Sequence, residues 1–470
     1  MTRSRTARLA AVAQWNRGIK LTDLPNELLL MICLYLNPTD VAKLRGEHWK
    51  LAAAGIEHIV SELIINFTEA SFQKLEAVSR HPIISRYVTS LLWEADCLPV
   101  VDRDRWERMI ESPEKMAAWR AQFVMDTAPG DVIGNRTRSE ALTNYLDMPQ
   151  HQYTKVQLDE AWTRFRALRS EQSYLLMSAN FGDRMTTALK RFPRLKHMTM
   201  STGHVYNNSS NCDAREYKIY GPSFSLFTHG TGLTSMCGMS QALRLLMGAY
   251  QAGTQLETFE CGSVDWKLLA QSHEVFAIMK GAVSNLKEMD LLLHLTPGGP
   301  LLPLGGAQAE VEECKELLAS GRLQDFITSA PYLEVLSIGF HWGPFLSIAD
   351  LKITVGGFHW PHLRSVCFEN IAATEDDMID FLGRHKETLK VLQIRDLYLD
   401  EGELLSMFRR MRSSLELEMV DFRGWFASRT NVRVWDLQYK EIKPSMLKLR
   451  VQNFVLRQGE STSIDDLGSR

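Results

Sequence analysis

A short hydrophobic formula recurs along the chain: a leucine, two mostly polar residues, an apolar residue, any residue, and a second apolar residue. The alternation in its second half is the period-two pattern of a β-strand with one buried face, and the leucine closes the turn into that strand. Two looser copies, at residues 60–65 and 88–93, precede the clear ones. The seven clear copies begin at Leu195, Leu256, Leu286, Leu333, Leu363, Leu389 and Leu417.

The spacing of the copies predicts the architecture. The last four copies begin 30, 26 and 28 residues apart, close to the period of leucine-rich repeats, and the longer earlier intervals imply inserted loops and helices. Strands and helices alternate, which favours stacked strand-helix units around a parallel sheet. The predicted fold class is therefore α/β, with an irregular leucine-rich-repeat-like solenoid over residues 191–459. An ordinary α/β domain with leucine-rich strands is the alternative.

Helices are expected between these strands. Residues 374–377 resemble a capping box, which begins a helix, and Asp400 is expected to open a helix with apolar residues at three- and four-residue spacing. Residues 156–177 also read as an amphipathic helix. A last helix, stopped by Gly459, would cap the open end of the solenoid.

The N-terminal stretch 21–52 has a different pattern. Leu24-Pro25 marks a helix start and Asn37-Pro38 a stop, because proline fits the first helical turn but not the interior. Every residue from 28 to 36 is apolar, so this helix must be covered on more than one side, by the chain itself or by a partner. A second helix is expected from Thr39-Asp40 through Trp49.

The order Leu24-Pro25-x-Glu27-Leu28-Leu29-x-x-Ile32, followed by Leu36, Asp40, Leu44-Arg45 and Trp49, resembles an F-box. The resemblance implies docking on the adaptor Skp1, and through it membership of a cullin-RING ubiquitin ligase. Residues 46–48 depart from the family pattern, which usually has an apolar and a small residue there. A capped, fully buried core helix is the alternative. The resemblance implies an adaptor surface that includes Leu24, Pro25, Leu28, Ile32, Leu36 and Leu44.

The predicted organisation divides the chain into six parts. A basic tail (1–20) precedes the F-box-like helices (21–60) and the first irregular repeats (61–93). A helical insertion (94–190) precedes the solenoid (191–459), and a disordered tail (460–470) ends the chain. The insertion and residues 79–82 resemble the middle of fungal F-box proteins. Residues 203–233 and 296–306, rich in glycine and polar residues or proline, are expected to be loops.

Composition narrows the possible partners and compartments. The chain has 470 residues, of which 45% are hydrophobic, and a formal net charge of −3, so charge favours neither nucleic acid nor a membrane as partner. Its seven cysteines are scattered and form no Cys-x-x-Cys, which is typical of a reduced cytoplasmic or nuclear protein. The arginine-rich, acid-free first twenty residues are either a simple tail or a mitochondrial transit peptide.

No motif for catalysis or for a cofactor is present. The glycines of residues 296–306 lack the lysine of a phosphate loop, and no Cys or His pair has the spacing to complete a metal site. No serine or cysteine stands in a catalytic signature. The sequence is therefore interpreted as a non-catalytic substrate receptor without cofactors. A repeat scaffold without a ligase role is the second interpretation, and an enzyme with an unrecognised site is the third.

The strand formula also predicts a surface for the protein target. Residues between the apolar positions of each strand point away from the core, and in leucine-rich repeats this face is the concave wall. Acids dominate its middle and arginines its C-terminal end, so we expect a basic target segment and salt-sensitive binding. The predicted target-binding residues are Glu260, Glu288, Asp290, Glu369, Arg395 and Arg423.

Overall fold

An eleven-stranded sheet runs through the computed structural model, in the order β1-β2-β3-β4-β5-β6-β8-β9-β10-β11 with β7 beside β8. Neighbouring strands pair in parallel, except that β10 and β11 are antiparallel. The protein is therefore a mixed α/β protein with a mostly parallel sheet. The structure describes residues 20–36, 38–95, 97–98, 100–110, 154–178, 180–201, 232–294, 304–341, 349–437, 439–440, 443–444 and 446–457.

The recurring formula predicts these strands correctly. Each of its seven clear copies is followed by a strand that begins two residues after the leucine, and the two looser copies coincide with β1 and β2. Alternate side chains are buried at the start of β5 and of β8, as the period of two requires, and both strands continue into a run of buried residues. The strands are β1 (Glu62–Asn66), β2 (Ser90–Glu94), β3 (His197–Ser201), β4 (Thr258–Asp265), β5 (Glu288–His294), β6 (Val335–His341), β7 (Ala349–Asp350), β8 (Ser365–Thr374), β9 (Val391–Glu401), β10 (Met419–Ser428) and β11 (Asn431–Asp436).

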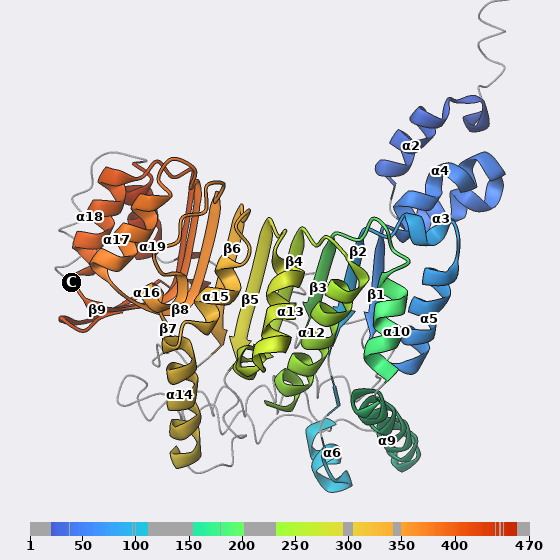
Figure 1. Ribbon diagram of the computed structural model, residues 1–470, viewed down its shortest axis with the longest axis horizontal. Helices are drawn as coiled ribbons and strands as arrows, with labels where there is room; N and C mark the ends of the chain where they lie inside the picture. The colour runs from blue at the N-terminus through green and yellow to red at the C-terminus, as the bar shows by residue number, and fades with distance from the viewer. Residues whose placement is uncertain are drawn as a thin grey trace, which may run out of the picture.

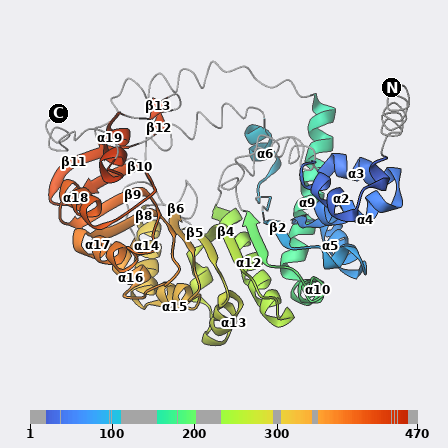
Figure 2. The same ribbon diagram turned by 90° about the horizontal axis from the view of Figure 1, so that it is seen from above.

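Helices cover one side of this sheet. Seen from above, the strands line the inner side of an arc and the helices its outer side (Figure 2). The core lies between these two layers and runs continuously from β1 to α19. The outer helices are α5 (Glu69–Arg80), α10 (Asn180–Leu189), α12 (Gly232–Ala252), α13 (His273–Val283), α15 (Arg322–Thr328), α16 (Leu351–Val355), α17 (Glu375–Arg384) and α18 (Leu404–Ser414).

Hydrogen bonds repeat from one strand-helix unit to the next. The N–H groups of Glu257 and Thr258 both donate to the carbonyl of Lys196, and those of Lys287 and Glu288 both donate to the carbonyl of Glu257. The same pattern continues through β6, β8, β9 and β10. Because each unit satisfies the backbone groups at the start of the next one, the units stack in register.

A second repeated feature lies in the middle of the last strands. Asn370 and Asp396 have φ of 56° and Gly424 has φ of 81°, and each follows a residue that is paired in register with its neighbours. The carboxylate Oδ1 of Asp396 accepts the N–H of Trp425 at 2.7 Å. A Cβ on Gly424 would lie 2.1 Å from that same oxygen, so both the positive φ and the close approach require glycine there.

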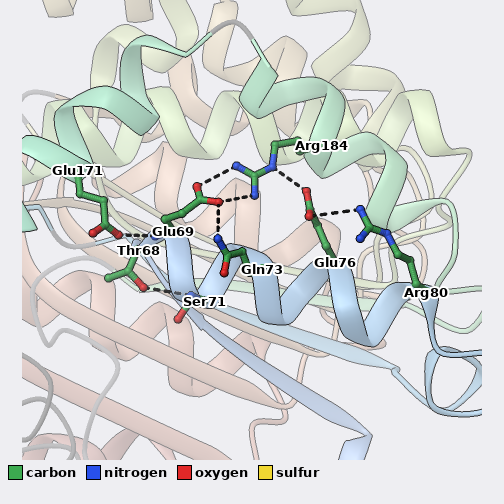
Figure 3. A network of polar contacts seen from close by, with 8 residues as sticks. All are labelled: Thr68, Glu69, Ser71, Gln73, Glu76, Arg80, Glu171 and Arg184. Carbon is green, nitrogen blue, oxygen red and sulfur yellow. Dashed lines mark hydrogen bonds and ion pairs between the residues drawn. The ribbon is translucent and has the colours of Figure 1, made fainter.

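The N-terminal side of the sheet is held by an ionic network (Figure 3). Arg184 of α10 donates two hydrogen bonds of 2.9 Å to Glu69 of α5, and its Nε donates to Glu76 at 2.7 Å. Its guanidinium also lies over the ring of Phe72, with Cζ 4.6 Å from the ring centroid. The hydrogen bonds from Arg184 lower the pKa of Glu69. These contacts fix α5 against α10.

The other end of the sheet is covered by α19 (Met446–Val455), as predicted for the last helix. The side chain of Gln452 donates to the carbonyl of Val420 at 2.7 Å, on the part of β10 that β11 does not pair with. Buried Lys448 forms an ion pair of 2.7 Å with Asp421. The helix thus satisfies polar groups on the last parallel strand that would otherwise be open to pairing with another chain.

A small second core lies beside β2, between α6 (Arg103–Ile110) and α9 (Lys155–Met177) (Figure 1). Trp106 and Phe165 are buried there, and Trp162 stacks on Phe165 with ring centroids 5.4 Å apart. Buried Gln172 of α9 accepts the N–H of Leu98 and donates to the carbonyl of Phe67. The bounds of α9 confirm the helix predicted over residues 156–177.

Three sequence predictions are wrong in detail. The expected helix from Thr39 through Trp49 is two helices, since α3 (Pro38–Glu47) ends before His48, whose ring accepts the Lys50 N–H at 3.1 Å and caps α4 (Trp49–Val60). No helix opens at Asp400, because β9 continues to Glu401 and α18 follows. The loop expected over residues 296–306 is contradicted at its end, because α14 (Leu304–Ala319) begins at Leu304.

Several predictions fall largely or wholly outside the described residues. These are the tails at residues 1–20 and 460–470, the loop at 203–233, and the stop at Gly459. At the edges of these ranges, Lys20 precedes a short 3₁₀ helix, η1 (Leu21–Asp23), and Gly232 begins α12. Two other 3₁₀ helices are η2 (Ile84–Arg86), which precedes β2, and η4 (Trp266–Ala270), which follows β4. Two short antiparallel strands, β12 (Tyr439–Lys440) and β13 (Lys443–Pro444), lie before α19.

Candidate partner-binding surfaces

The first candidate surface is built by the three N-terminal helices, α2 (Asn26–Leu34), α3 and α4. Leu29 of α2 packs with Leu51 and Ala54 of α4 in a small core, and Leu24 and Leu44 lie partly buried against it. Lys50 donates to the carbonyl of Thr22 at 3.0 Å, which ties α4 to the segment before α2. This core is separate from the core under the sheet.

The opposite side of α2 is exposed although it is apolar. Its large side chains follow one another at three- and four-residue spacing, and therefore line one helical face. Exposed apolar residues are common singly on protein surfaces, but a contiguous row on one helix is typical of an interaction site. We call these residues the apolar face: Leu28 (44% exposed), Met31 (52%), Leu34 (66%) and Tyr35 (86%).

Some of the six predicted adaptor residues are exposed, and others pack against the small core. Leu28 and Pro25 are exposed, Ile32 and Leu36 are half-buried, and Leu24 and Leu44 pack partly against the small core. The resemblance alone did not point to Met31, Leu34 or Tyr35. The three-residue steps from Leu28 to Leu34 were a usable signal, but an unbroken apolar run does not tell which side a helix buries.

The N-terminal helices are fastened to the sheet without a linker. Ser61 alone separates α4 from β1, and its carbonyl accepts the N–H groups of Thr89 and Ser90 at 2.9 Å each. The hydroxyl of Thr89 donates to the same carbonyl at 3.2 Å. The end of α4 is thus tied to the start of β2 as well as to β1.

The second candidate surface is the inner side of the sheet, which we call the inner wall. The strand register aligns its side chains in rows that run across neighbouring strands. One row is formed by the third residue of each strand from β3 to β10, apart from β7. That row reads Thr199, Glu260, Asp290, Ser337, Cys367, Gln393 and Asp421.

The predicted acidic residues of β4 and β5 are adjacent on the inner wall. Glu260 and Asp290 are partners in register and both are half-buried, and Glu288 is exposed two residues before Asp290. Glu260 accepts a hydrogen bond of 3.0 Å from the hydroxyl of Thr199. The sheet therefore brings these three carboxyl groups together, as the period of two predicts.

The remaining predicted target residues lie at the C-terminal end of the inner wall and are paired with one another or with neighbours. Arg395 donates to Glu369 at 3.1 Å. Arg423 forms an ion pair of 2.6 Å with Asp421, which Lys448 contacts from the other side. Glu369 and Asp421 are thus each matched by an arginine.

The described residues offer little for redox or metal chemistry. Burial raises the pKa of the Cys314 thiol to about 12 and also raises that of Cys261, so neither is an activated nucleophile. Within the described ranges, no group of three His, Cys, Asp or Glu side chains could hold a metal ion. Among the helices searched in these ranges, none has the length and apolar content to cross a membrane.

Comparison with known proteins adds no relative. A scan against models of protein families returns no match, and a search of curated proteins finds no significantly similar sequence. The functional argument therefore rests on the two surfaces and on the residues that form them.

Proposed function

We propose that the protein is the non-catalytic substrate receptor of a Skp1–cullin–F-box ubiquitin ligase. In this proposal the apolar face binds a Skp1-like adaptor, and through it a cullin. The strand-helix units form a leucine-rich-repeat-like solenoid whose inner wall holds a protein target. The receptor raises the local concentration of the target near the ubiquitin-charged enzyme and supplies no catalytic group itself.

The apolar face is the observation that carries this proposal. Three large apolar side chains of α2 and the tyrosine that ends it are exposed to water, although the same helix buries Leu29 and Cys33 on its other side. Covering one such side chain stabilises an interface by about 1.5–3 kcal/mol, so leaving a whole row exposed favours a partner. The Leu-Pro-x-Glu start of α2 is the feature that the F-box resemblance adds.

The architecture supports the second half of the proposal. Strand-helix units of roughly thirty residues stack in register, with strands inside and helices outside, as leucine-rich repeats do. Among the residues that the structure describes, the helices beside the central strands lie on the outer side of the arc, as Figure 2 shows. A wall of this kind offers a concave surface to a ligand.

The adaptor interaction can be tested with Met31→Lys combined with Leu34→Lys. Both side chains are mostly exposed, so the protein should fold normally, whereas an adaptor surface would have to bury two charges. We expect at least ~100-fold weaker binding to Skp1, about 3 kcal/mol, measured by titration with purified adaptor.

A matched control is Tyr174→Lys combined with Met177→Lys. These residues of α9 are 72% and 87% exposed and lie outside the apolar face, so this variant should bind Skp1 like the wild type. Circular dichroism shows whether each variant is folded. Equal Skp1 binding by all three proteins would contradict the F-box assignment, and absence of binding by folded wild type would favour a scaffold without a ligase role.

A further inference from the structure

Basic side chains gather where α5 and α10 end and where β2 and β3 begin. The two helices are joined by Arg184 and lie below α3 and α4 in Figure 1, and η2 contacts α4. The guanidinium of Arg194 lies over the ring of Tyr87, 5.9 Å from its centroid, so the turns that lead into β2 and β3 are neighbours. We call the three exposed bases of these turns the basic edge: Arg86, Lys190 and Arg191.

The positive charge of the basic edge is not neutralised by the described residues around it. None of its three side chains forms an ion pair with a residue that the structure describes. The neighbouring acids are already matched, since Glu76 is shared by Arg184 and Arg80. Glu257, in the next turn, is held by two lysines, whose hydrogen bonds lower its pKa to about 2.

Two exposed acids on the same elements lie away from the basic edge. Glu62 begins β1, and because Leu63 is buried against the helices, the side chain of Glu62 lies on the inner wall. Asp183 lies in the first turn of α10. It is about 10 Å from Lys190 along the helix, at ~1.5 Å per residue. The basic edge therefore presents three positive charges to solvent.

The helix ends explain only part of this charge. Lys190 and Arg191 follow the last turn of α10, where positive charge is favourable next to the helix dipole. Arg86 belongs to a single 3₁₀ turn, which has little dipole, so helix stabilisation does not account for it. Further along the sheet, the residues just before the strands alternate in sign and offset one another. They are Lys196, Glu257, Lys287, Glu334 and Arg364.

The arrangement of the bases sets the class and size of a ligand. Packed helices lie ~8–10 Å apart, and an extended chain advances ~3.3 Å per residue, so a segment of about four residues spans the ends of α5 and α10. Proteins that hold nucleic acid by charge make roughly 6–10 phosphate contacts, more than three bases provide. The formal net charge of −3 also gives no general attraction to a polyanion. A short acidic stretch of a protein fits the basic edge better.

We propose that the basic edge binds an acidic segment of a protein partner, with about four consecutive residues that carry at least three carboxylates. The carboxylates accept charge-assisted hydrogen bonds from the two guanidinium groups and the ammonium group. The inference goes beyond the proposed function, because neither the apolar face nor the inner wall contributes a residue to this edge.

Synthetic peptides test the inference on the full chain. The probe is a fluorescein-labelled peptide of four glutamates between glycine and serine residues, and the comparison peptide has four glutamines instead. We expect the wild type to bind the glutamate peptide at least ~10-fold more tightly by fluorescence anisotropy at low salt. The difference should shrink at high salt, because screening shortens the range of the attraction.

Two variants separate charge from fold. The neutral variant, Arg86→Gln with Lys190→Gln and Arg191→Gln, should bind both peptides about equally, since the electrostatic attraction is lost. The charge-preserving variant, Arg86→Lys with Arg191→Lys, should keep the preference for glutamate. All the changed side chains are exposed, so the melting temperature of each variant should stay close to that of wild type.

A matched control removes three exposed bases elsewhere. Lys155→Gln, Arg166→Gln and Arg429→Gln change residues of α9 and of the turn after β10, and none of these side chains forms an ion pair with a described residue. This control has the same net charge as the neutral variant. It should keep the wild-type preference.

The outcomes support or overturn the inference as follows. Preference for glutamate in the wild type and in the control, with its loss in the neutral variant, supports it. Equal binding of both peptides by wild type, or an undiminished preference in the neutral variant, overturns it. Tighter binding of a labelled single-stranded DNA through the same three residues also overturns it. Skp1 binding is tested at the apolar face, so a failure here leaves the proposed function unchanged.

Discussion

His385 gives a prediction whose size follows from the structure. The imidazole is fully buried, with Nδ1 2.9 Å from the carbonyl of Phe381. The N–H of Trp360 donates to Nε2 at 3.1 Å, so Nε2 carries no proton and Nδ1 donates to Phe381. Burial, with a smaller effect from neighbouring His359 and Arg384, lowers the pKa of His385 to about 4.

The sign of the pH dependence follows from this shift. An unfolded histidine takes up a proton below about pH 6.5, whereas the folded imidazole stays neutral down to about pH 4. The stabilisation is therefore complete above pH ~6.5 and is lost progressively as the pH falls towards ~4. Between about pH 7.5 and about pH 5, linkage with these two pKa values predicts a loss of about 2 kcal/mol in the free energy of unfolding.

The assay is urea unfolding of wild type and His385→Gln at the two pH values. Glutamine can accept the Trp360 N–H but does not titrate, so the variant should lose about 2 kcal/mol less than wild type on acidification. The control His359→Gln changes an exposed histidine whose ring stacks on His385 at 5.2 Å, and should behave nearly as wild type. An identical pH response of wild type and His385→Gln would refute the reasoning.

Two further predictions concern stability and are measured by urea unfolding. Arg184→Met removes a bidentate ion pair with Glu69 and should lower the free energy of unfolding by about 2 kcal/mol, and Arg184→Lys should restore only part of it. Gly424→Ala should cost at least about 2 kcal/mol, because its Cβ would meet Asp396 in a left-handed backbone conformation. Gly46→Ala, in an exposed helix with no atom near the new Cβ, should instead stabilise by up to about 1 kcal/mol. A smaller loss for Gly424→Ala than for Arg184→Lys would show that strain at the glycine is overestimated.

The strands were predictable from the sequence because their signal is local. Six of the seven leucines, such as Leu333, are buried just before a strand, and Leu417 is half-buried. In the first half of these strands alternate residues are buried as well. The parallel pairing followed from the helices between them. The end of β9 was not predictable in the same way, since Asp400 has the properties of a helix cap but stays in the strand. Continued pairing of β9 with β8 beyond Asp396 extends the strand and overrides the local preference.

The candidate surfaces were only partly predictable. Whether Leu28 or Leu29 faces water depends on Leu51, which lies in another helix, and no pattern within the apolar run encodes that contact. The ion pair between Glu369 and Arg395 likewise joins residues of different strands. Because of this pair, Glu369 adds little to the net negative charge of the inner wall. The sequence predicted which residues lie on this face of the sheet. The distribution of charge on it could be described only from the strand register and the ion pairs.

The joint at Ser61 connects the two surfaces in the proposed function. Because only Ser61 separates α4 from β1 and its carbonyl is held by Thr89 and Ser90, the apolar face cannot move far relative to the inner wall without breaking these hydrogen bonds. An adaptor on α2 and a target on the inner wall would then be held at a fixed separation, with no shared residue. Binding at one surface should leave affinity at the other unchanged, while the orientation between them determines how a bound target is presented.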